Sequence, residues 1–272
     1  MLKIPSVKLN FASQNTTMIT DTHTHLYSEE FAQDRDAMIQ RAIEKGVGRF
    51  FIPAIDSAYT EAMYALEKQY PDNIFLMMGL HPTYVKPETF EAELQYVETE
   101  LAKRKFYAVG EIGIDLYWDK TTLDIQKVAF RRQIQLAKKY KLPINIHCRD
   151  AFNEIFEVLE SEKSPELFGI FHCFTGNYDQ AIQAISLNMK LGIGGVVTFK
   201  NGKIDQFLHQ IDIQNIVLET DSPYLAPVPY RGKRNESSYI VNVVEKLAMI
   251  YELPTAEIAR ITTENSKAVF GI

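Results

Sequence analysis

Asp21-Thr-His-Thr-His25 follows the first apolar run of the chain and places two imidazoles at positions i and i+2. On a β-strand, side chains at this spacing point to one face with Cα atoms roughly 6.6 Å apart, so both rings can contact one ion. On a helix the same two rings would diverge. The stretch therefore predicts a strand that ends in a metal site.

Three more histidines and two carboxylates each lie at the end of a later apolar run. A lone histidine in such a place is more often a hydrogen-bonded core residue, but the recurrence of the pattern favours a shared metal site. Imidazole and carboxylate ligands suit a borderline or hard divalent ion, and neither cysteine has the spacing of a ligand pair. We leave His209 as a surface residue. The five further candidates are His81, Glu111, His147, His172 and Asp221.

Short apolar runs alternate with segments of helical periodicity along the chain, which predicts parallel strands joined by right-handed helical crossovers. Eight such units in 272 residues favour an α/β fold, a closed (β/α)₈ TIM barrel, whose C-terminal strand ends carry the chemistry. We expect strands at 18–21, 49–54, 74–79, 107–111, 143–147, 169–172, 189–194 and 216–219. We expect helices at 29–45, 59–69, 90–104, 123–140, 151–160, 178–186, 204–209, 239–251 and 255–270.

Length and composition predict a single domain. A hydrophobic content of 46% supports one sizeable core, and residues 18–272 form the expected barrel. Met18 stands where the first strand must begin, so residues 1–17 are expected to be an N-terminal extension or arm. The sequence contains no apolar stretch of membrane-spanning length and no apolar signal segment, which predicts a cytoplasmic protein.

A net charge of −6 gives no overall attraction to polyanions, so any nucleic-acid contact must be local. The best local candidate is Tyr230-Arg-Gly-Lys-Arg-Asn235, whose three cationic side chains can hold phosphate oxygens. On charge alone, a solvated surface loop is an equally good interpretation.

Seven short motifs follow one another from Met18 almost to the C-terminus. They are Asp21-Thr-His-Thr-His-Leu26, Gly79-Leu-His-Pro82, Gly110-Glu-Ile-Gly-Ile-Asp115, Ile146-His-Cys-Arg-Asp-Ala151, Phe171-His-Cys-Phe-Thr-Gly176, Glu219-Thr-Asp-Ser-Pro-Tyr-Leu225 and Arg231-Gly-Lys-Arg-Asn-Glu236. In this order they resemble the motifs of the TatD family of metal-dependent hydrolases. The family is an amidohydrolase-like barrel whose members hydrolyse DNA, often as exonucleases, with divalent metal.

The resemblance implies two divalent ions, Mg²⁺, Mn²⁺ or Zn²⁺, and assigns their ligands. His23, His25 and Asp221 would hold one ion, His147 and His172 would hold the second, and Glu111 would bridge the two. It also implies that Arg231, Lys233, Arg234 and Asn235 bind substrate. The chain departs from many relatives at Thr83 and Ser237, which puts substrate preference in doubt more than hydrolysis.

The resemblance therefore implies a hydrolase of phosphodiester bonds, a 3'-5' exonuclease-type deoxyribonuclease. The negative net charge adds the expectation that it acts on strand ends or single strands. Asp221 would accept the proton of the attacking water, and His81 would contact the scissile phosphate or the leaving group. Glu219 either supports a histidine ligand or makes a structural hydrogen bond. Asp115 has the same alternatives, with a turn-forming role slightly favoured. We expect neither membrane contact nor an obligate protein partner.

Two rival interpretations stay open. The same metal site can polarise a carbonyl group, which would make the chain an ester or amide hydrolase such as an aminoacyl-tRNA deacylase. A barrel bridged by a carboxylated lysine is disfavoured, because the fourth strand carries Glu111 where that lysine would be needed. The second rival is a metal-bearing binding or regulatory module, which is disfavoured because every candidate ligand is present.

Overall fold

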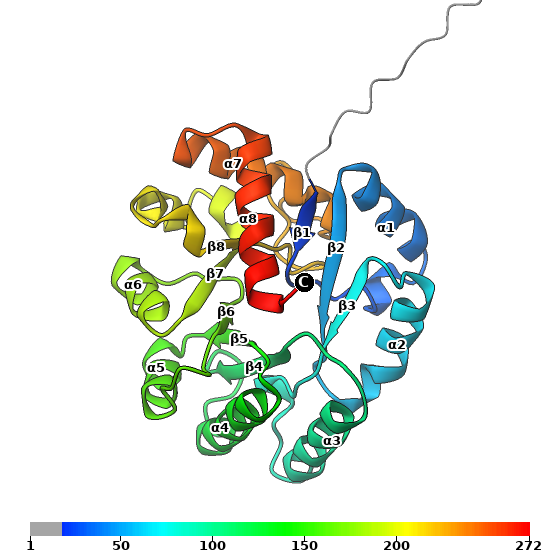
Figure 1. The fold of residues 1–272 in the computed structure, drawn as a ribbon, viewed down its shortest axis with the longest axis vertical. Coiled ribbons are helices and arrows are strands. Elements are labelled where there is room, and N and C mark those ends of the chain that lie inside the picture. The colour runs from blue at the N-terminus through cyan, green and yellow to red at the C-terminus, as the bar shows by residue number, and fades with distance from the viewer. Residues whose placement is uncertain (1–17) are drawn as a thin grey trace, which may run out of the picture.

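The structure is a computed structural model that describes residues 18–272, and the expected extension at residues 1–17 lies outside the described residues. Eight parallel strands alternate with helices that surround them (Figure 1). Several strands are buried along their whole length, as strands covered on both faces of a parallel sheet must be. The strands are β1 (Ile19–Asp21), β2 (Val47–Pro53), β3 (Ile74–Met77), β4 (Val109–Asp115), β5 (Ile144–Arg149), β6 (Gly169–Phe171), β7 (Met189–Ile193) and β8 (Ile216–Leu218).

The strands close into a ring. Regular parallel pairing runs from β1 to β3 and from β4 to β8. The backbone N–H of Thr22 donates to the carbonyl of Leu218 at 2.9 Å and joins the β1 end to β8. Between β3 and β4, the N–H of Tyr107 donates to the carbonyl of Leu76 at 2.9 Å, and Met78 forms a parallel bridge with Val109. These contacts confirm the predicted (β/α)₈ barrel.

Helices α1 to α6 each follow the strand of the same number, whereas α7 and α8 both follow β8 (Figure 1). Local signals set several of their ends: Asn177 and Gln180 form a capping box at the start of α6, and Gly271 ends α8 with φ 70°. The helices are α1 (Arg35–Glu44), α2 (Thr60–Gln69), α3 (Phe90–Lys103), α4 (Leu123–Tyr140), α5 (Phe152–Ser161), α6 (Tyr178–Ser186), α7 (Ile240–Tyr251) and α8 (Thr255–Phe270).

Three of the predicted elements differ from the structure. The helix expected at 29–45 is a 3₁₀ turn at Glu29–Phe31 followed by an α-helix that begins only at Arg35. The expected helix at 204–209 forms two single-turn 3₁₀ helices, Ile204–Gln206 and Leu208–Gln210, because so short a segment cannot offset the cost of nucleating an α-helix. The fourth strand was expected to end at Glu111 but continues to Asp115. Its continuation depends on Gly113, with φ +144°, where a Cβ would lie 2.0 Å from the carbonyl oxygen of His147 on β5.

The last turn of α8 closes one end of the barrel. Val269 and Phe270 pack with buried side chains of four strands, and the ring of Phe270 stacks on Phe51 of β2 with centroids 3.6 Å apart. Thr263 of α8 also donates to the carbonyl of Met18 at the start of β1. This end therefore lies at the N-terminal ends of the strands, and Figure 1 places the C-terminus over the centre of the ring.

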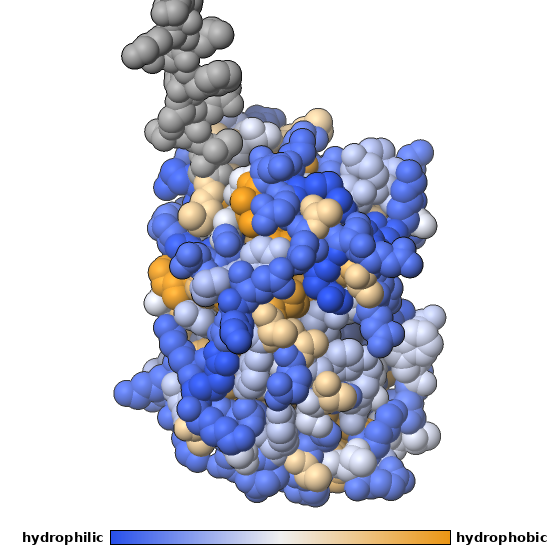
Figure 2. Space-filling view, turned by 90° about the vertical axis from the view of Figure 1, so that its right-hand side faces the viewer, coloured by the Kyte–Doolittle hydropathy of each residue, from blue (hydrophilic) through white to orange (hydrophobic). Residues whose placement is uncertain are grey.

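One face of the molecule is mainly polar (Figure 2). The face in Figure 2 is largely hydrophilic, with apolar residues in small separate groups. None of the helices within residues 18–272 combines the length and the apolar content needed to cross a membrane.

Replacing Phe51 by alanine tests the closure of the barrel by α8. Phe51 is fully buried and stacks on Phe270, so the substitution should lower the free energy of unfolding by about 3–5 kcal/mol, measured by denaturant titration. Met249→Ala is the control, because Met249 is 77% exposed on α7 and its loss should change stability by no more than about 0.5 kcal/mol. Equal stability of the two variants would contradict this packing.

Candidate metal centre

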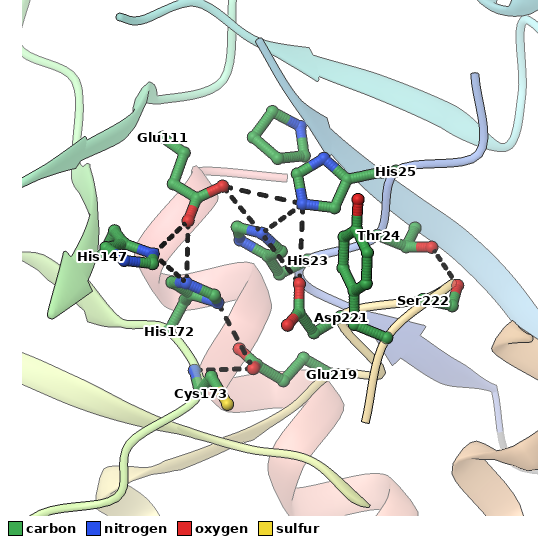
Figure 3. Close-up of polar contacts among 12 residues, drawn as sticks. His23, Thr24, His25, Glu111, His147, His172, Cys173, Glu219, Asp221 and Ser222 are labelled. Carbon is green, nitrogen blue, oxygen red and sulfur yellow. Dashed lines mark hydrogen bonds and ion pairs between the residues drawn. The ribbon is translucent and has the colours of Figure 1, made fainter. Parts of the chain in front are cut away.

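All seven predicted side chains meet at the C-terminal end of the barrel. His147 lies on β5, and Glu111 lies inside β4 rather than at its end. Figure 3 shows how the rings and carboxylates converge from strands that are far apart in sequence. The remaining positions follow the ends of their strands: His23 and His25 after β1, His81 after β3, His172 after β6 and Asp221 after β8.

Glu111 lies at the centre of the cluster, and its residue is only 2% exposed. Its Oε1 is 2.8 Å from Nδ1 of His147 and 2.9 Å from Nε2 of His172. Nε2 of His81 lies 3.3 Å from the same oxygen. Its Oε2 is 3.3 Å from Nε2 of His23 and 3.6 Å from Nε2 of His25. One carboxylate is thus in contact with five imidazoles.

Asp221 completes the side of the cluster around His23 and His25. Its Oδ1 lies 3.7 Å from Nε2 of His23 and 3.5 Å from Nε2 of His25. Asp221 has φ 54°, a left-handed conformation that aspartate tolerates, and its N–H donates to the carbonyl of His23 at 2.9 Å. The turn after β8 therefore holds this carboxylate against the end of β1.

In both His23 and His25, the ring nitrogen that points away from Glu111, called the outer nitrogen, has a protein partner. Nδ1 of His23 lies 2.8 Å from Oδ1 of Asn145, which can only accept, so this nitrogen carries a proton. Nδ1 of His25 lies 2.9 Å from the Tyr27 hydroxyl, which donates to the carbonyl of Pro53 at 3.0 Å and accepts from the ring. With one proton on each ring, both Nε2 atoms are left with a bare lone pair.

The two bare nitrogens face each other at 3.2 Å, beside the oxygens of Glu111 and Asp221. Electron-pair donors packed this closely without a proton between them repel one another, and a cation among them removes that repulsion. Within residues 18–272, three triples of side chains have ligand atoms within 4.8 Å of one another. The residues present therefore fit a divalent metal. The triples are His23, His25 and Asp221; His23, Glu111 and His172; and His81, Glu111 and His147.

Carboxylates also contact the outer nitrogens of His147 and His172. Nε2 of His147 is 2.9 Å from Oδ2 of Asp115. Nδ1 of His172 is 3.6 Å from Oε1 of Glu219, an oxygen that also accepts from the N–H of Cys173 at 2.6 Å. Gly192 leaves room for this carboxylate, since a Cβ there would lie 2.2 Å from its Oε2. Such outer partners orient metal-binding imidazoles.

Burial and the neighbouring imidazoles shift the pKa of Glu111 in opposite directions. Burial alone would raise the pKa of Glu111, but the surrounding imidazoles, His81 first, hold it well below its ordinary value. Burial likewise acts to raise the pKa of Asp221, but the contact with His25 and the charges of His172 and His23 together lower it below its ordinary value. Both carboxylates are therefore ionised at neutral pH, as metal ligands must be.

The pKa values of two imidazoles are raised, whereas those of the two carboxylates are lowered. Burial would lower the pKa of His172, but its contacts with Glu111 and Glu219 together raise it well above its ordinary value. Burial lowers the pKa of His147 as well, and its contacts with Asp115 and Glu111 outweigh that effect and raise it. Without an ion these rings tend to hold a second proton, so a metal ion competes with protons for them.

His81 is set apart by its local hydrogen bonds. Its Nδ1 accepts from the backbone N–H of Thr83 at 3.2 Å, which places the proton of the neutral ring on Nε2. Burial lowers the pKa of His81 to about 4, so the ring is neutral at physiological pH. Its inner nitrogen is therefore a hydrogen-bond donor that faces the cluster.

The basic loop divides into exposed and structural residues. Arg231 and Lys233 are exposed, with the Arg231 guanidinium 3.8 Å from the centre of the Phe199 ring. Arg234 makes a two-point ion pair with Asp34 at 2.7 and 2.8 Å. Asn235 is buried, and its amide donates to two backbone carbonyls at 2.7 Å, which ties the loop to the turn after β8. Substrate binding by the four predicted residues stays a prediction.

Sequence reasoning missed two of the side chains that support the cluster, Asn145 and Tyr27, and ranked the supporting role of a third, Asp115, second. Asn145 lies two residues before His147 on β5, so the period of two could have placed it on the same face. Tyr27 follows His25 by two residues in a turn, where no such period applies. Asp115 accepts from two turn N–H groups as predicted, but it also contacts His147.

Comparison with known proteins places the chain among metal-dependent hydrolases. The family model described as TatD related DNase matches residues 20–271. The uncharacterized metal-dependent hydrolase YabD of Bacillus subtilis is 41% identical over 257 residues, which cover 94% of this chain and 100% of the relative. The 3'-5' ssDNA/RNA exonuclease TatD of Yersinia pseudotuberculosis is 31% identical over 258 residues, which cover 93% of this chain and 99% of that protein.

A solved structure agrees with these matches. The crystal structure of YjjV, a TatD homologue from Escherichia coli, superposes with a TM-score of 0.88 at 29% identity. The superposition covers 94% of this chain and 99% of that one.

The contact between Asn145 and His23 can be tested by metal affinity. Asn145→Ala removes the acceptor that fixes the His23 proton on Nδ1, so affinity for Mn²⁺ or Zn²⁺ should fall about 10- to 100-fold in chelator competition. Asn73→Ala is the matched control, because the Asn73 amide donates to the Gly48 carbonyl beside the start of β3, at the other end of the barrel. Unchanged affinity in folded Asn145→Ala would refute this role.

Proposed function

This chain belongs to the TatD family of metal-dependent hydrolases, and from that membership we propose that it is a 3'-5' exonuclease of single-stranded DNA with two divalent ions. We further propose that His23, His25 and Asp221 hold one ion and that His147 and His172 hold the other. Glu111 would bridge them.

The position of the Glu111 carboxylate carries the proposal. One of its oxygens faces His23 and His25, and the other faces His147 and His172. A carboxylate that offers one oxygen to each of two ligand groups is suited to hold two ions together. The ions would lower the pKa of an attacking water and would bind the phosphate oxygens of a phosphodiester.

Asp221 is the best candidate for the proton acceptor. Its side chain is 13% exposed, against 3% for that of Glu111, so a water molecule in the mouth can reach it. The imidazoles around it keep the carboxylate ionised, since they hold its pKa below the ordinary value despite its burial. Asp221 would accept the proton of the attacking water while His23 and His25 fix its orientation.

His81 would act as a hydrogen-bond donor toward the reacting phosphate. Thr83 holds the ring proton on the inner nitrogen, and the ring is neutral above its lowered pKa of about 4. Its side chain is 12% exposed, so substrate can reach it. The donor would stabilise charge that develops on a phosphate or leaving-group oxygen.

A nucleic-acid substrate is supported by a relative and by local charge. The Yersinia pseudotuberculosis relative is named a 3'-5' ssDNA/RNA exonuclease. Arg231 and Lys233 are exposed cations on the loop that Asn235 ties beside Asp221, where they can pair with phosphates of an incoming strand. The overall charge of −6 disfavours tight binding of long duplexes and favours single strands.

Release of nucleotides from end-labelled strands tests this function. The metal-stripped protein should release mononucleotides from single-stranded DNA when Mg²⁺, Mn²⁺ or Zn²⁺ is restored, and a 5' label should reveal stepwise shortening from the 3' end. Asp221→Asn should reduce the rate by about 10²- to 10⁴-fold, because the side chain can no longer accept a proton.

RNA and duplex DNA of the same sequence serve as competing substrates in this assay. Met249→Ala, prepared in the same way, is the control variant and should cleave as wild type does. A preference for internal sites in long duplex DNA would refute the exonuclease. Failure to cleave with any ion bound would refute a nuclease and would favour ester hydrolysis, to be tested next with an aminoacyl ester.

A further inference from the structure

Two aromatic side chains are exposed on the loop between β4 and α4. Tyr117 is 55% exposed and Trp118 is 70% exposed. Their rings meet edge to face with centroids 5.0 Å apart. Trp118 is the only tryptophan of the chain, and packing in the core does not account for its position. Aromatic faces left in water at the mouth of a barrel are available to a planar ligand.

The backbone that carries these rings is fixed. Oδ1 of Asp115 accepts from the N–H groups of Tyr117 at 3.0 Å and Trp118 at 3.1 Å. The N–H of Leu116 donates to the carbonyl of Arg149 at 2.9 Å. The other oxygen of Asp115 contacts His147 at 2.9 Å. One buried carboxylate therefore anchors both the aromatic loop and a candidate metal ligand, which sets the rings in a defined place beside the metal centre.

Arg149 completes this surface. It lies on β5 two residues after His147 and so on the same side of the strand. Its guanidinium is 3.6 Å from the centre of the Tyr117 ring and 5.6 Å from that of Trp118. Within residues 18–272 it forms no ion pair with a carboxylate. An exposed cation stacked on an aromatic ring keeps its N–H donors available to an anion.

We propose that Tyr117, Trp118 and Arg149 form a nucleotide subsite beside the metal centre, in which Trp118 stacks on a base and Arg149 binds the adjacent phosphate. The proposal rests on the nuclease function above and adds a site that binds the substrate strand. Stacking on an aromatic ring tolerates every base, whereas a guanidinium reads the phosphate that every nucleotide carries. The subsite would therefore hold single strands without regard to sequence, and paired bases inside a duplex could not reach it.

The single tryptophan gives a direct test, because the intrinsic tryptophan fluorescence comes from Trp118 alone. The full chain with Mn²⁺ is titrated with a thymidine oligonucleotide whose phosphorothioate linkages slow hydrolysis. A second titration uses the same backbone with abasic spacers in place of the nucleosides. The subsite predicts a saturable fluorescence change with the first oligonucleotide and little change with the second.

Variants separate stacking from charge. Trp118→Ala should weaken binding of a labelled oligonucleotide about 5- to 100-fold, and Trp118→Phe should restore most of the affinity. Arg149→Gln should lower the slope of log affinity against log salt by about 0.7, the share of one phosphate contact, whereas Trp118→Ala should leave the slope unchanged. Met249→Ala, which removes an equally exposed apolar side chain on α7, should bind as wild type does.

The outcome distinguishes this subsite from the nuclease itself. Nucleotide release by the same preparation without a base-dependent fluorescence change, or with full affinity in Trp118→Ala, overturns the subsite and leaves the nuclease in place. Absence of both release and binding overturns both proposals. Thermal unfolding of each variant shows whether a loss of affinity comes from misfolding.

Discussion

The site depends on one buried carboxylate shared by five imidazoles. Glu111 is almost fully enclosed, and burial of an anion is costly unless positive charge compensates it. In the absence of metal, His147 and His172 supply that charge, since their pKa values are raised while that of Glu111 is lowered. A divalent ion on either side would take over the same role and displace the protons of the rings.

The barrel makes this arrangement possible because parallel strands end at one rim. Glu111 comes from β4, and the side chains around it lie on or follow β1, β3, β5, β6 and β8. A second set of groups, Asn145, Tyr27 and Asp115, fixes the outer nitrogens of the histidines. The opposite end is closed by Phe270 on Phe51, so a substrate must approach from the metal side.

Much of this was predictable from sequence. The strands and the candidate ligands follow from a period of two and from the alternation of strands with helices, and these signals are local. The contact of Asn145 with His23 joins residues 122 positions apart, which no local pattern contains. The continuation of β4 to Asp115 was missed because it depends on the close approach of Gly113 to β5. The resemblance to TatD proteins added roles that geometry alone leaves open.

The central claim is that Glu111 joins two ions. A crystal of the protein grown with Mn²⁺ and measured at the manganese absorption edge tests it most directly. The account predicts two anomalous peaks, one beside each oxygen of Glu111, with His23, His25 and Asp221 around the first and with His147 and His172 around the second. A single peak, or ions that leave Glu111 without contact, would contradict it.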